Sequence, residues 1–350
     1  MTDIPPRMRA LVLHSYEKGA ERLQVEDHPV TPPSRGEVLV RVAAAPINPS
    51  DLVFLNGLYG FRKPLPVVPG FEGSGTVVAT GGGFLARRLL GKRVACAASE
   101  QRDGTWAEYA IAPAQGCFPL PAQVNDEQGA MALVNPLCAW GLMEQARRAR
   151  ARAVVSTAAA SQVGRMLVRL GQRFGIAVVC VVRRDGQIEL MKSLGATHVL
   201  NSTDPHFDAQ LLELCARLNA RLAFDAVGGE MTERLLAALP RGSRITLYGG
   251  LSQQPTRLQV QIPIFEGKIV DGFWVPTWIA RKNPLQLLLL QRSVLTLLGR
   301  ELRSEVRQRV AFDEARAALA AYSGEMTSGK MLLVPALERG VSAAAGAATH

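Results

Sequence analysis

The chain has 350 residues and a mass of 37.7 kDa, which is long for one hydrophobic core and predicts two domains. With 48% hydrophobic residues and a mean hydropathy of +0.09, the composition is that of a globular protein, and no apolar run approaches the roughly 18 residues of a membrane span. The net charge is +10, but the arginines are scattered and no aromatic-rich basic motif accompanies them. We therefore expect an anionic small-molecule substrate or an acidic carrier protein as partner, and neither nucleic acid nor a membrane.

Cysteine and histidine are used sparsely. The cysteines form no C-x-x-C pair and lie among apolar or small residues, so we expect buried, reduced thiols. The histidines are equally dispersed, and no metal site is predicted. The first residues, MTDIPPRMRALVLH, contain no long apolar segment, so no secretory signal is expected and the cytoplasm is the predicted compartment. The cysteines are Cys96, Cys117, Cys138, Cys180 and Cys215.

The chain up to about Ala112 is rich in short β-prone runs that are separated by Pro and Gly turns. One helix is predicted to interrupt them at Pro49, where Ser50 or Asp51 can cap its N-terminus. The predicted strands are Arg9–His14, Glu37–Val42, Gly75–Thr80, Arg93–Ala97 and Ala107–Ile111.

From about Asn125 to Val275, helices and strands alternate, which predicts a parallel, doubly wound sheet. The predicted strands are Val154–Ser156, Ala177–Val182, His198–Asn201, Leu222–Val227, Arg244–Tyr248 and Lys268–Val275. The predicted helices are Val163–Phe174, Gln187–Leu194, Phe207–Leu218 and Met231–Leu239. The last strand is apolar apart from Lys268 and Asp271, so its edge predicts pairing with a second copy in a homodimer.

The last part contains the predicted helices Pro284–Leu298 and Asp313–Tyr322 and a strand, Lys330–Val334. We expect this strand to rejoin the first domain and make it discontinuous. The predicted domains are residues 1–124, residues 125–275 for dinucleotide binding, and residues 276–338 for the return to the first domain. The Ala- and Gly-rich residues 339–350 are predicted to be a disordered tail.

The stretch Val154–Arg183 indicates one βαβ unit with a tight first turn, which presents a helix N-terminus to the pyrophosphate of a dinucleotide. Only Gly164 stands clearly where the G-x-G-x-x-G fingerprint has a glycine; Ala160 and Gln162 occupy other turn positions. A βαβ unit without a cofactor therefore remains an alternative. Arg183 and Arg184 follow the second strand, where a cation suits the 2′-phosphate of NADPH. The pattern predicts NADPH as the cofactor.

Motifs along nearly the whole chain resemble the medium-chain dehydrogenase/reductase superfamily, and specifically its zinc-free quinone reductase and enoyl-thioester reductase branch. Pro46–Asp51 resembles the signature of the N-terminal domain, and Pro69–Gly73 occupies the place where zinc alcohol dehydrogenases carry Gly-His-Glu. Phe71 stands at the ligand histidine, and the cysteine-rich structural-zinc lobe is missing, which argues against zinc catalysis. The resemblance implies an α/β fold with a discontinuous, GroES-like, β-rich catalytic domain and a doubly wound parallel Rossmann domain.

Finer features are similar to the mitochondrial-type 2-enoyl thioester reductases. The turn Ala160–Gly164 resembles the Asn-Ser-Gly-Val-Gly-like sequence of that subfamily. Gln162 is the main departure, and it either narrows the pyrophosphate site or turns its side chain outward. The other similar segments are Asn56–Gly60, Gly104–Trp106, Asn135–Pro136, Tyr248–Pro255 and Gly272–Trp274.

The resemblance implies roles for single residues, each with a plainer alternative. Tyr59 is implied as the catalytic hydroxyl that hydrogen-bonds the enolate oxygen or delivers the proton, or else it packs its ring in a loop. Asn48 is a catalytic hydrogen-bond donor, or a turn residue beside Pro49. Trp106 lines the acyl pocket or belongs to the core. Lys330 contacts the cofactor or is an exposed lysine at a strand start.

The remaining positions are implied to hold the cofactor, or else to be ordinary turn, cap or core residues. Phe273 and Trp274 would contact the nicotinamide amide through their backbone, or would lie in a dimer core. Asp225, at a strand end, is expected to be structural. The predicted cofactor positions are Asn135, Ala160, Ser161, Gln162, Val163, Gly164, Arg183, Arg184, Tyr248, Gly249, Gly250, Leu251, Phe273, Trp274, Val275 and Lys330.

Three functions are compatible with these features. The first is an NADPH-dependent reductase of 2-enoyl thioesters, with hydride transfer to the β-carbon and proton donation aided by Tyr59. The second is a quinone or enone reductase, which uses the same hydride transfer and can proceed without a proton donor at carbon. The third is a non-catalytic cofactor-binding protein, as lens crystallins of this superfamily are.

Overall fold

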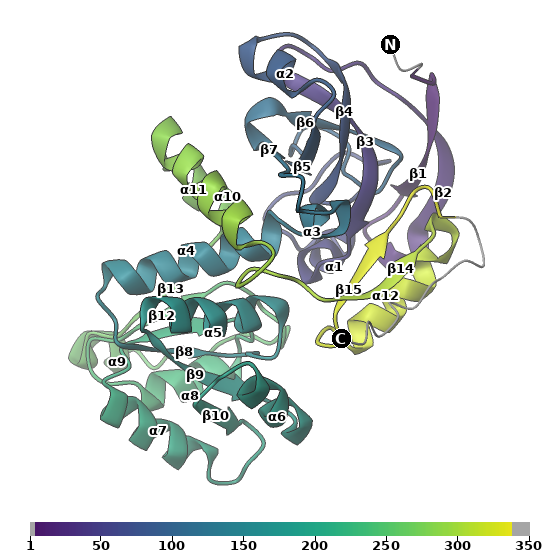
Figure 1. Ribbon diagram of the computed structural model, residues 1–350. Helices are drawn as coiled ribbons and strands as arrows, with labels where there is room; N and C mark the ends of the chain where they lie inside the picture. Colours follow the sequence, from purple (N-terminus) through teal and green to yellow (C-terminus); the bar gives the residue numbers. More distant parts are fainter. Residues whose placement is uncertain (1–3, 338–350) are drawn as a thin grey trace. The chain divides into compact units, whose positions relative to one another are not determined.

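The computed structural model describes residues 4–337, which form two compact units (Figure 1). Among these residues, the first unit comprises 4–134, Leu295–Gly299 and 303–337. The second unit comprises Asn135–Val294 and Arg300–Leu302. The predicted tail, residues 339–350, lies outside the described residues.

The first unit is built on a seven-stranded sheet of order β14-β15-β3-β4-β5-β7, with β6 paired to β3 and a separate β1-β2 pair. The strands are β1 (Arg7–Leu13), β2 (Leu23–Pro29), β3 (Glu37–Pro46), β4 (Glu72–Thr80), β5 (Arg93–Ala97), β6 (Tyr109–Pro113), β7 (Cys117–Pro119), β14 (Val306–Val310) and β15 (Lys330–Leu333). The helices are α1 (Pro49–Leu55), α2 (Phe84–Leu89), α3 (Asp126–Ala130) and α12 (Ala315–Gly324), with 3-10 turns η1 (Gly19–Arg22), η2 (Ala114–Gly116) and η3 (Phe312–Glu314).

The return of the chain to the first unit is confirmed. Strand β15 pairs antiparallel with β3, with Leu332 opposite Pro46, so the two ends of the chain share one sheet (Figure 1). Strand β14, which was not predicted, lies parallel to β15. Its sequence, VRQRV, carries three consecutive polar residues, and that pattern hides a strand from hydropathy alone.

The N-terminus of α1 differs from the prediction. Asn48, rather than Ser50 or Asp51, is the N-cap residue, and Pro49 takes the first helical position, where its missing N–H costs nothing. Asp51 stands three residues after the cap, and its Oδ2 accepts a 2.7 Å hydrogen bond from the backbone N–H of Asn48. This reciprocal arrangement fixes Asn48 at the end of β3.

The second unit is a six-stranded sheet of order β10-β9-β8-β11-β12-β13 in which all neighbours are parallel, with helices on both faces (Figure 1). The strands are β8 (Ala153–Ser156), β9 (Ala177–Val182), β10 (His198–Asn201), β11 (Leu222–Asp225), β12 (Arg244–Leu247) and β13 (Ile269–Gly272). The helices are α4 (Val134–Arg148), α5 (Gln162–Phe174), α6 (Asp185–Ser193), α7 (Phe207–Leu218), α8 (Glu230–Ala238), α9 (Gln261–Glu266), α10 (Val275–Ala280) and α11 (Pro284–Leu297).

The edge strand β13 is shorter than the predicted run 268–275. Lys268 precedes the strand, and its buried amine donates a 2.6 Å hydrogen bond to the Leu236 carbonyl. Helix α10 already begins at Val275, so the segment turns away from the sheet after Gly272. Helix α9 just before the strand was not predicted.

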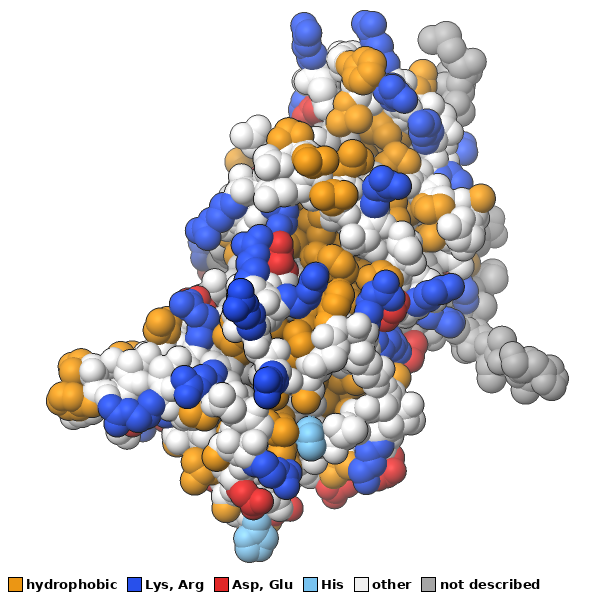
Figure 2. Space-filling model, turned by 60° about the vertical axis from the view of Figure 1, so that its left-hand side comes forward, with side chains coloured by type: hydrophobic (Ala, Val, Ile, Leu, Met, Phe, Trp, Pro, Cys, Tyr) orange, Lys and Arg blue, Asp and Glu red, His pale blue; other side chains and the backbone are white. Residues whose placement is uncertain are grey.

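The prediction for the cysteines is confirmed: all five are buried, unpaired thiols. Burial of this kind raises the pKa of Cys96, Cys138 and Cys180 to about 12 and keeps them protonated. Within residues 4–337, no helix is both long and apolar enough to span a bilayer. Lys and Arg side chains are spread over the face that Figure 2 shows, with exposed hydrophobic side chains between them.

Candidate active site

The turn between β8 and α5 is the most constrained feature of the second unit. Ser161 is the N-cap residue of α5, and its hydroxyl accepts a 3.2 Å hydrogen bond from the Gly164 N–H. A Cβ atom on Gly164 would lie 2.3 Å from the Ala159 carbonyl oxygen, so only glycine fits there. The helix therefore starts tightly against the end of β8, with its N-terminal N–H groups at the carboxyl edge of the sheet.

Gln162, the departure from the family pattern, keeps its side chain inside the unit. Only 6% of the residue is exposed, so the outward orientation is not the one adopted. It occupies the first position of α5, next to Ser161 and Val163.

Arg165 is a component of this turn that sequence reasoning missed. The residue is 2% exposed, and its Nε donates a 2.9 Å hydrogen bond to the Ala160 carbonyl. A cation buried in the first turn of a helix adds to the positive end of the helix dipole. The sequence feature that could have indicated a buried Arg165 is its position inside the apolar run VGRML.

Arg183 and Arg184 follow β9, which lies next to β8. Both side chains are exposed, and neither forms an ion pair with another residue of the described chain. Their backbone N–H groups donate to Gln187 Oε1, at 3.1 and 3.3 Å, which fixes the start of α6. The two cations are therefore held at the same sheet edge as the turn.

Tyr248 and Asn135 of the second unit each carry a buried polar atom that has no hydrogen-bond partner within residues 4–337. Tyr248 follows β12, and its hydroxyl lies near the Ser156 and Ser161 side chains, which lower its pKa and offset part of the effect of burial. Burial raises the pKa of Tyr248, so its hydroxyl remains a donor. Unsatisfied buried donors of this kind are typical of a ligand site.

The loops on either side of this edge are fixed by short contacts. A Cβ atom on Gly249 would lie 2.8 Å from the Ala226 carbonyl oxygen, whereas Gly250 faces open space and Leu251 is exposed. Asp225 accepts 2.6 Å hydrogen bonds from the hydroxyls of Thr157 and Thr232, in agreement with its predicted structural role.

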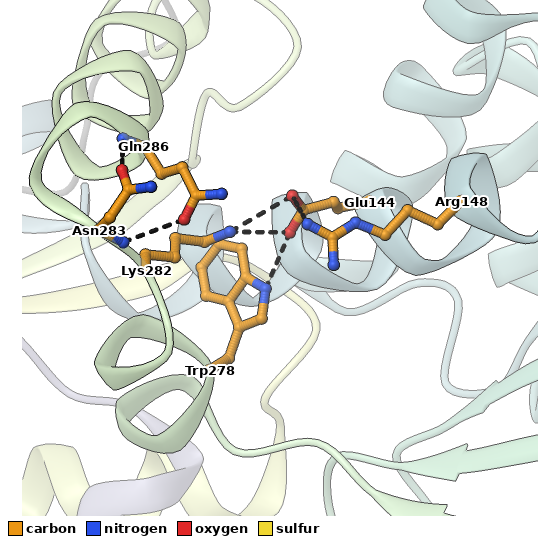
Figure 3. Close-up of polar contacts among 6 residues, drawn as sticks. All are labelled: Glu144, Arg148, Trp278, Lys282, Asn283 and Gln286. Carbon is orange, nitrogen blue, oxygen red and sulfur yellow. Dashed lines mark hydrogen bonds and ion pairs between the residues drawn. The ribbon is translucent and has the colours of Figure 1, made fainter.

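Segment 273–282 is fastened to α4. The Phe273 ring lies against Gly141, where a Cβ atom would be 2.3 Å away, and the Phe273 N–H donates to the Leu247 carbonyl. Figure 3 shows Trp278 and Lys282 pointing at Glu144, with 2.9 and 3.0 Å contacts to its Oε2. Burial would raise the pKa of Glu144, but these hydrogen bonds outweigh it and hold the pKa low. Trp274 is 39% exposed, and Val275 opens α10.

The first unit contains a buried polar network around Asn48. Its Nδ2 donates a 3.0 Å hydrogen bond to Glu72 Oε1, and its Oδ1 accepts from Lys330 Nζ. Glu72 Oε2 accepts the backbone N–H groups of Leu133 and Val134, at 2.8 and 2.9 Å. Lys330 also donates to the Ile47 carbonyl at 3.2 Å. We call Asn48, Asp51, Glu72 and Lys330 the buried network.

The network is almost completely closed to solvent. Asn48 and Asp51 are 0% exposed, and Glu72 and Lys330 are 1% exposed, so Lys330 is not the exposed lysine of the plainer alternative. Burial lowers the pKa of Lys330 to about 8 and raises the pKa of Asp51 to about 7, and it raises the pKa of Glu72 as well. In this structure Asn48 and Lys330 bind each other rather than facing an open site.

Tyr59 lies in an aromatic cluster, defined here as Tyr16, Phe54, Tyr59, Phe61 and Phe71. Its half-buried ring contacts Phe61 and Phe71 at centroid distances of 5.2 and 4.6 Å. Phe71, at the position of the zinc-ligand histidine, also packs on Phe54 at 5.6 Å. An apolar ring therefore fills the place of a metal ligand, and no group of three or more His, Cys, Asp or Glu residues in the described chain is arranged to hold a metal.

Trp106 does not line a pocket. The side chain is 0% exposed, and its Nε1 donates a 3.2 Å hydrogen bond to the Pro46 carbonyl. A Cβ atom on Gly70 would lie 2.5 Å from its ring. The indole is therefore packed in the core beneath Gly70, which favours the core alternative for Trp106.

Comparison with known sequences gives a separate family match for each of the two units. A family model of zinc-binding dehydrogenases matches residues 163–290, and one of the alcohol dehydrogenase GroES-like domain matches residues 34–122. The mitochondrial enoyl-[acyl-carrier-protein] reductase of Homo sapiens is 30% identical over 335 residues, 94% of this chain and 89% of its own length. That of Xenopus tropicalis is 33% identical over 274 residues, 75% of this chain and 77% of its own.

Solved structures agree with the fold along nearly the whole chain. A Mesorhizobium loti protein assigned as an NADPH:quinone reductase matches with a TM-score of 0.89 and 35% identity, covering 95% of this chain and 100% of its own. A mycobacterial protein solved in complex with NADPH matches with a TM-score of 0.81 and 25% identity, covering 94% and 100%.

Proposed function

We propose that this chain, which belongs to the quinone-reductase-like branch of the medium-chain dehydrogenase/reductase superfamily, is a zinc-independent, NADPH-dependent reductase of 2-enoyl thioesters. One observation carries the proposal: an enoyl-[acyl-carrier-protein] reductase matches 94% of the chain at 30% identity. The chain is an oxidoreductase by this relationship, and the thioester substrate is our inference.

The residues at the sheet edge of the second unit fit a dinucleotide. The glycine-only contact at Gly164 lets the N-terminus of α5 pack directly against the Ala159 backbone, so that its N–H groups lie at the carboxyl edge of the sheet, where a pyrophosphate binds in such a fold. The unsatisfied Tyr248 hydroxyl and Asn135 amide are donors for the ribose and nicotinamide side. Arg165 adds positive charge at the turn, and we assign Arg183 and Arg184, which are exposed after β9, to the 2′-phosphate. NADPH, when bound, supplies the hydride.

The chain's own contribution to the chemistry is charge stabilisation and proton transfer. Addition of hydride at the β-carbon places negative charge on the thioester oxygen, and a proton must then reach the α-carbon. The Tyr59 hydroxyl can donate to that oxygen or deliver the proton, because its ring is held by Phe61 and Phe71. The buried network has a positioning role, because its hydrogen bonds hold Asn48 and the end of β3 beside α1.

A quinone or enone reductase is the second candidate, favoured by the 35% identity to the Mesorhizobium loti protein. A cofactor-binding protein without catalysis is the third. Initial rates with NADPH and either crotonyl-CoA or a simple quinone separate the three. We expect crotonyl-CoA to be reduced faster; a preference for the quinone would support the second candidate, and no turnover of either substrate would support the third.

We expect the purified protein to contain no stoichiometric zinc and to keep its activity in the presence of a chelator. The reason is that Phe71 fills the ligand position with a packed aromatic ring. Elemental analysis by plasma mass spectrometry is the measurement. One zinc per chain, or a loss of activity with chelator that zinc restores, would contradict the expectation.

Replacing Arg183 and Arg184 together by alanine should raise the KM for NADPH by about tenfold or more and leave the KM for NADH nearly unchanged. A guanidinium pairs with a phosphate, and NADH has none at the 2′ position. Arg150→Ala, an exposed arginine of the same unit, is the control. Equal losses with both cofactors would show that the pair does not bind the 2′-phosphate.

We further propose that two copies associate through the edge of the second unit's sheet. Strand β13 ends the sheet, and the chain segments before and after it expose many large apolar side chains. Ten large apolar side chains between residues 251 and 289 are exposed: Leu251, Leu258, Val260, Ile264, Phe265, Ile269, Trp274, Leu285, Leu288 and Leu289.

Light scattering at micromolar concentration should therefore give twice the chain mass of 37.7 kDa. Ile269→Arg, on the edge strand, should give the monomer because it introduces like charges at the symmetric contact. Leu212→Arg, on an exposed position of α7, should remain dimeric. A monomeric wild-type protein would refute the proposed association.

A further inference from the structure

The first unit contains a basic surface cavity that the proposed reduction does not use. Its volume is about 560 Å³, and it lies where the chain leaves β4 and enters α2. Three arginines line it and no carboxylate does. The lining residues are Arg35, Gly81, Gly82, Gly83, Phe84, Arg87 and Arg88, and we call this cavity the arginine pocket.

The three guanidinium groups have no ion-pair or hydrogen-bond partner among the described residues. None of Arg35, Arg87 and Arg88 forms an ion pair or a side-chain hydrogen bond there, whereas Arg93, Arg102 and Arg309 of the same unit all bind carboxylates. The carboxylate nearest in sequence, Glu37, is itself held by Arg102 at 2.8 Å. Three like charges around one cavity repel each other unless an anion enters.

The walls of the pocket leave room for a ligand. Gly82 and Gly83 have φ values of +96° and +94°, and a Cβ atom on Gly82 would meet nothing within 4 Å. Phe84 is 77% exposed, and the Arg88 guanidinium lies 5.3 Å from its ring centroid. An exposed ring beside a guanidinium plane is a surface on which a planar base can stack.

The arginine pocket is separate from the residues proposed for the reduction. It lies at the start of β3 and the end of β4, whereas Asn48 and Glu72 lie at the opposite ends of these strands. At about 3.3 Å per residue, the ten residues of β3 separate the two places by roughly 30 Å. The dinucleotide turn belongs to the other unit.

From these observations we infer that the arginine pocket is a second ligand site, which binds the phosphate group of a nucleoside phosphate. Arg35, Arg87 and Arg88 pair with the phosphate oxygens, and the base stacks on Phe84. A phosphate dianion has more acceptor oxygens and more negative charge than a carboxylate, so it can accept hydrogen bonds from several guanidinium groups at once. The site is independent of the proposed function.

Isothermal titration of the full chain at low ionic strength with inorganic phosphate, and separately with AMP, tests this inference. Both should bind the wild type, and Arg87→Ala/Arg88→Ala should weaken both by at least about tenfold. Arg22→Ala, at an exposed arginine of the same unit that forms no ion pair within residues 4–337, should bind like the wild type. Arg183→Ala/Arg184→Ala should retain the phosphate signal, which separates that signal from binding at the proposed 2′-phosphate site.

The two probes distinguish the source of the phosphate. AMP that binds at least tenfold tighter than phosphate, with the difference lost in Phe84→Ala, identifies a nucleotide; equal affinities identify the phosphate group alone. Unchanged phosphate affinity in Arg87→Ala/Arg88→Ala would overturn the inference. Binding of an acidic carrier protein but of neither probe would also overturn it and would make the pocket a protein-docking surface.

Discussion

Tyr59→Phe is expected to reduce enoyl-thioester turnover by roughly 10²–10³, which corresponds to the loss of one preorganised donor worth about 3–4 kcal/mol. The substitution keeps the ring and so keeps its packing on Phe61 and Phe71. Only the hydroxyl is removed. The KM for NADPH should change little, because the dinucleotide turn belongs to the other unit. The thermal midpoint should also change little, because the packing of the ring is kept.

The size of the effect should depend on the substrate. Reduction of a quinone requires no proton at carbon, so Tyr59→Phe should slow quinone reduction less than crotonyl-CoA reduction. Steady-state rates with both substrates on the same preparation give this ratio directly. A uniform loss would instead indicate that the substitution disturbs the aromatic cluster.

Tyr16→Phe is the matched control for this experiment. Tyr16 belongs to the same aromatic cluster, with its ring 5.8 Å from Phe54, and its hydroxyl hydrogen-bonds the backbone of Lys63 at 2.8 Å. Its loss should lower stability but not turnover. If Tyr59→Phe reduces crotonyl-CoA at nearly the wild-type rate, Tyr59 is a packing residue and the quinone reductase becomes the better proposal.

The strands of the second unit and the helices α5 to α8 between them could be predicted from the sequence, whereas α4, α9 and α10 were not predicted. Strands such as β8 and β9 are short, continuous apolar runs because both faces of a parallel sheet are covered, and turns with small residues separate them from helices. Strands at the margins of the first unit could not be predicted. Strand β14, VRQRV, reads as polar, and it is held by backbone pairing to β15.

Some residues of the candidate site could likewise be predicted from the sequence, and others could not. Ser161 and Gly164 act through local turn geometry, which a sequence motif records directly. The contact between Asn48 and Lys330 joins residues at opposite ends of the chain and depends on β15 pairing with β3. The sequence predicts that this strand rejoins the first domain, but it does not give the register of the pairing or the side-chain contact that follows from it. For the same reason it could not show that Trp106 is enclosed beneath Gly70.

Lys330→Met should lower the free energy of unfolding by about 3–5 kcal/mol near pH 8. It leaves the buried Ile47 carbonyl and Asn48 Oδ1 without their donor, and it leaves the carboxylate charges uncompensated in the roughly half of the molecules in which Lys330 is protonated at that pH. Lys330 is 1% exposed and lies beside Asn48, and its charge lowers the pKa of both Glu72 and Asp51. Urea denaturation monitored by circular dichroism measures the loss. Lys92→Met, an exposed lysine of the same unit, should change stability by less than about 0.5 kcal/mol.

The destabilisation by Lys330→Met should also depend on pH. The folded-state pKa of Asp51 is raised to about 7, so the folded protein binds more protons than the unfolded chain between about pH 4 and 7, and stability from this group falls as the pH rises through that window. Without the Lys330 charge, the pKa values of Asp51 and Glu72 rise further, and this fall becomes steeper. The variant should therefore lose less stability at pH 5, where Asp51 is protonated, than at pH 8.

A second substitution separates charge from packing in this prediction. Glu72→Gln removes one of the uncompensated carboxylates, so Lys330→Met/Glu72→Gln should recover part of the stability that Lys330→Met loses at pH 8. The glutamine still accepts from the backbone N–H groups of Leu133 and Val134 through its amide oxygen. An equal loss at pH 5 and pH 8, with no recovery in the double variant, would show that the Lys330 side chain acts by filling space and not by its charge.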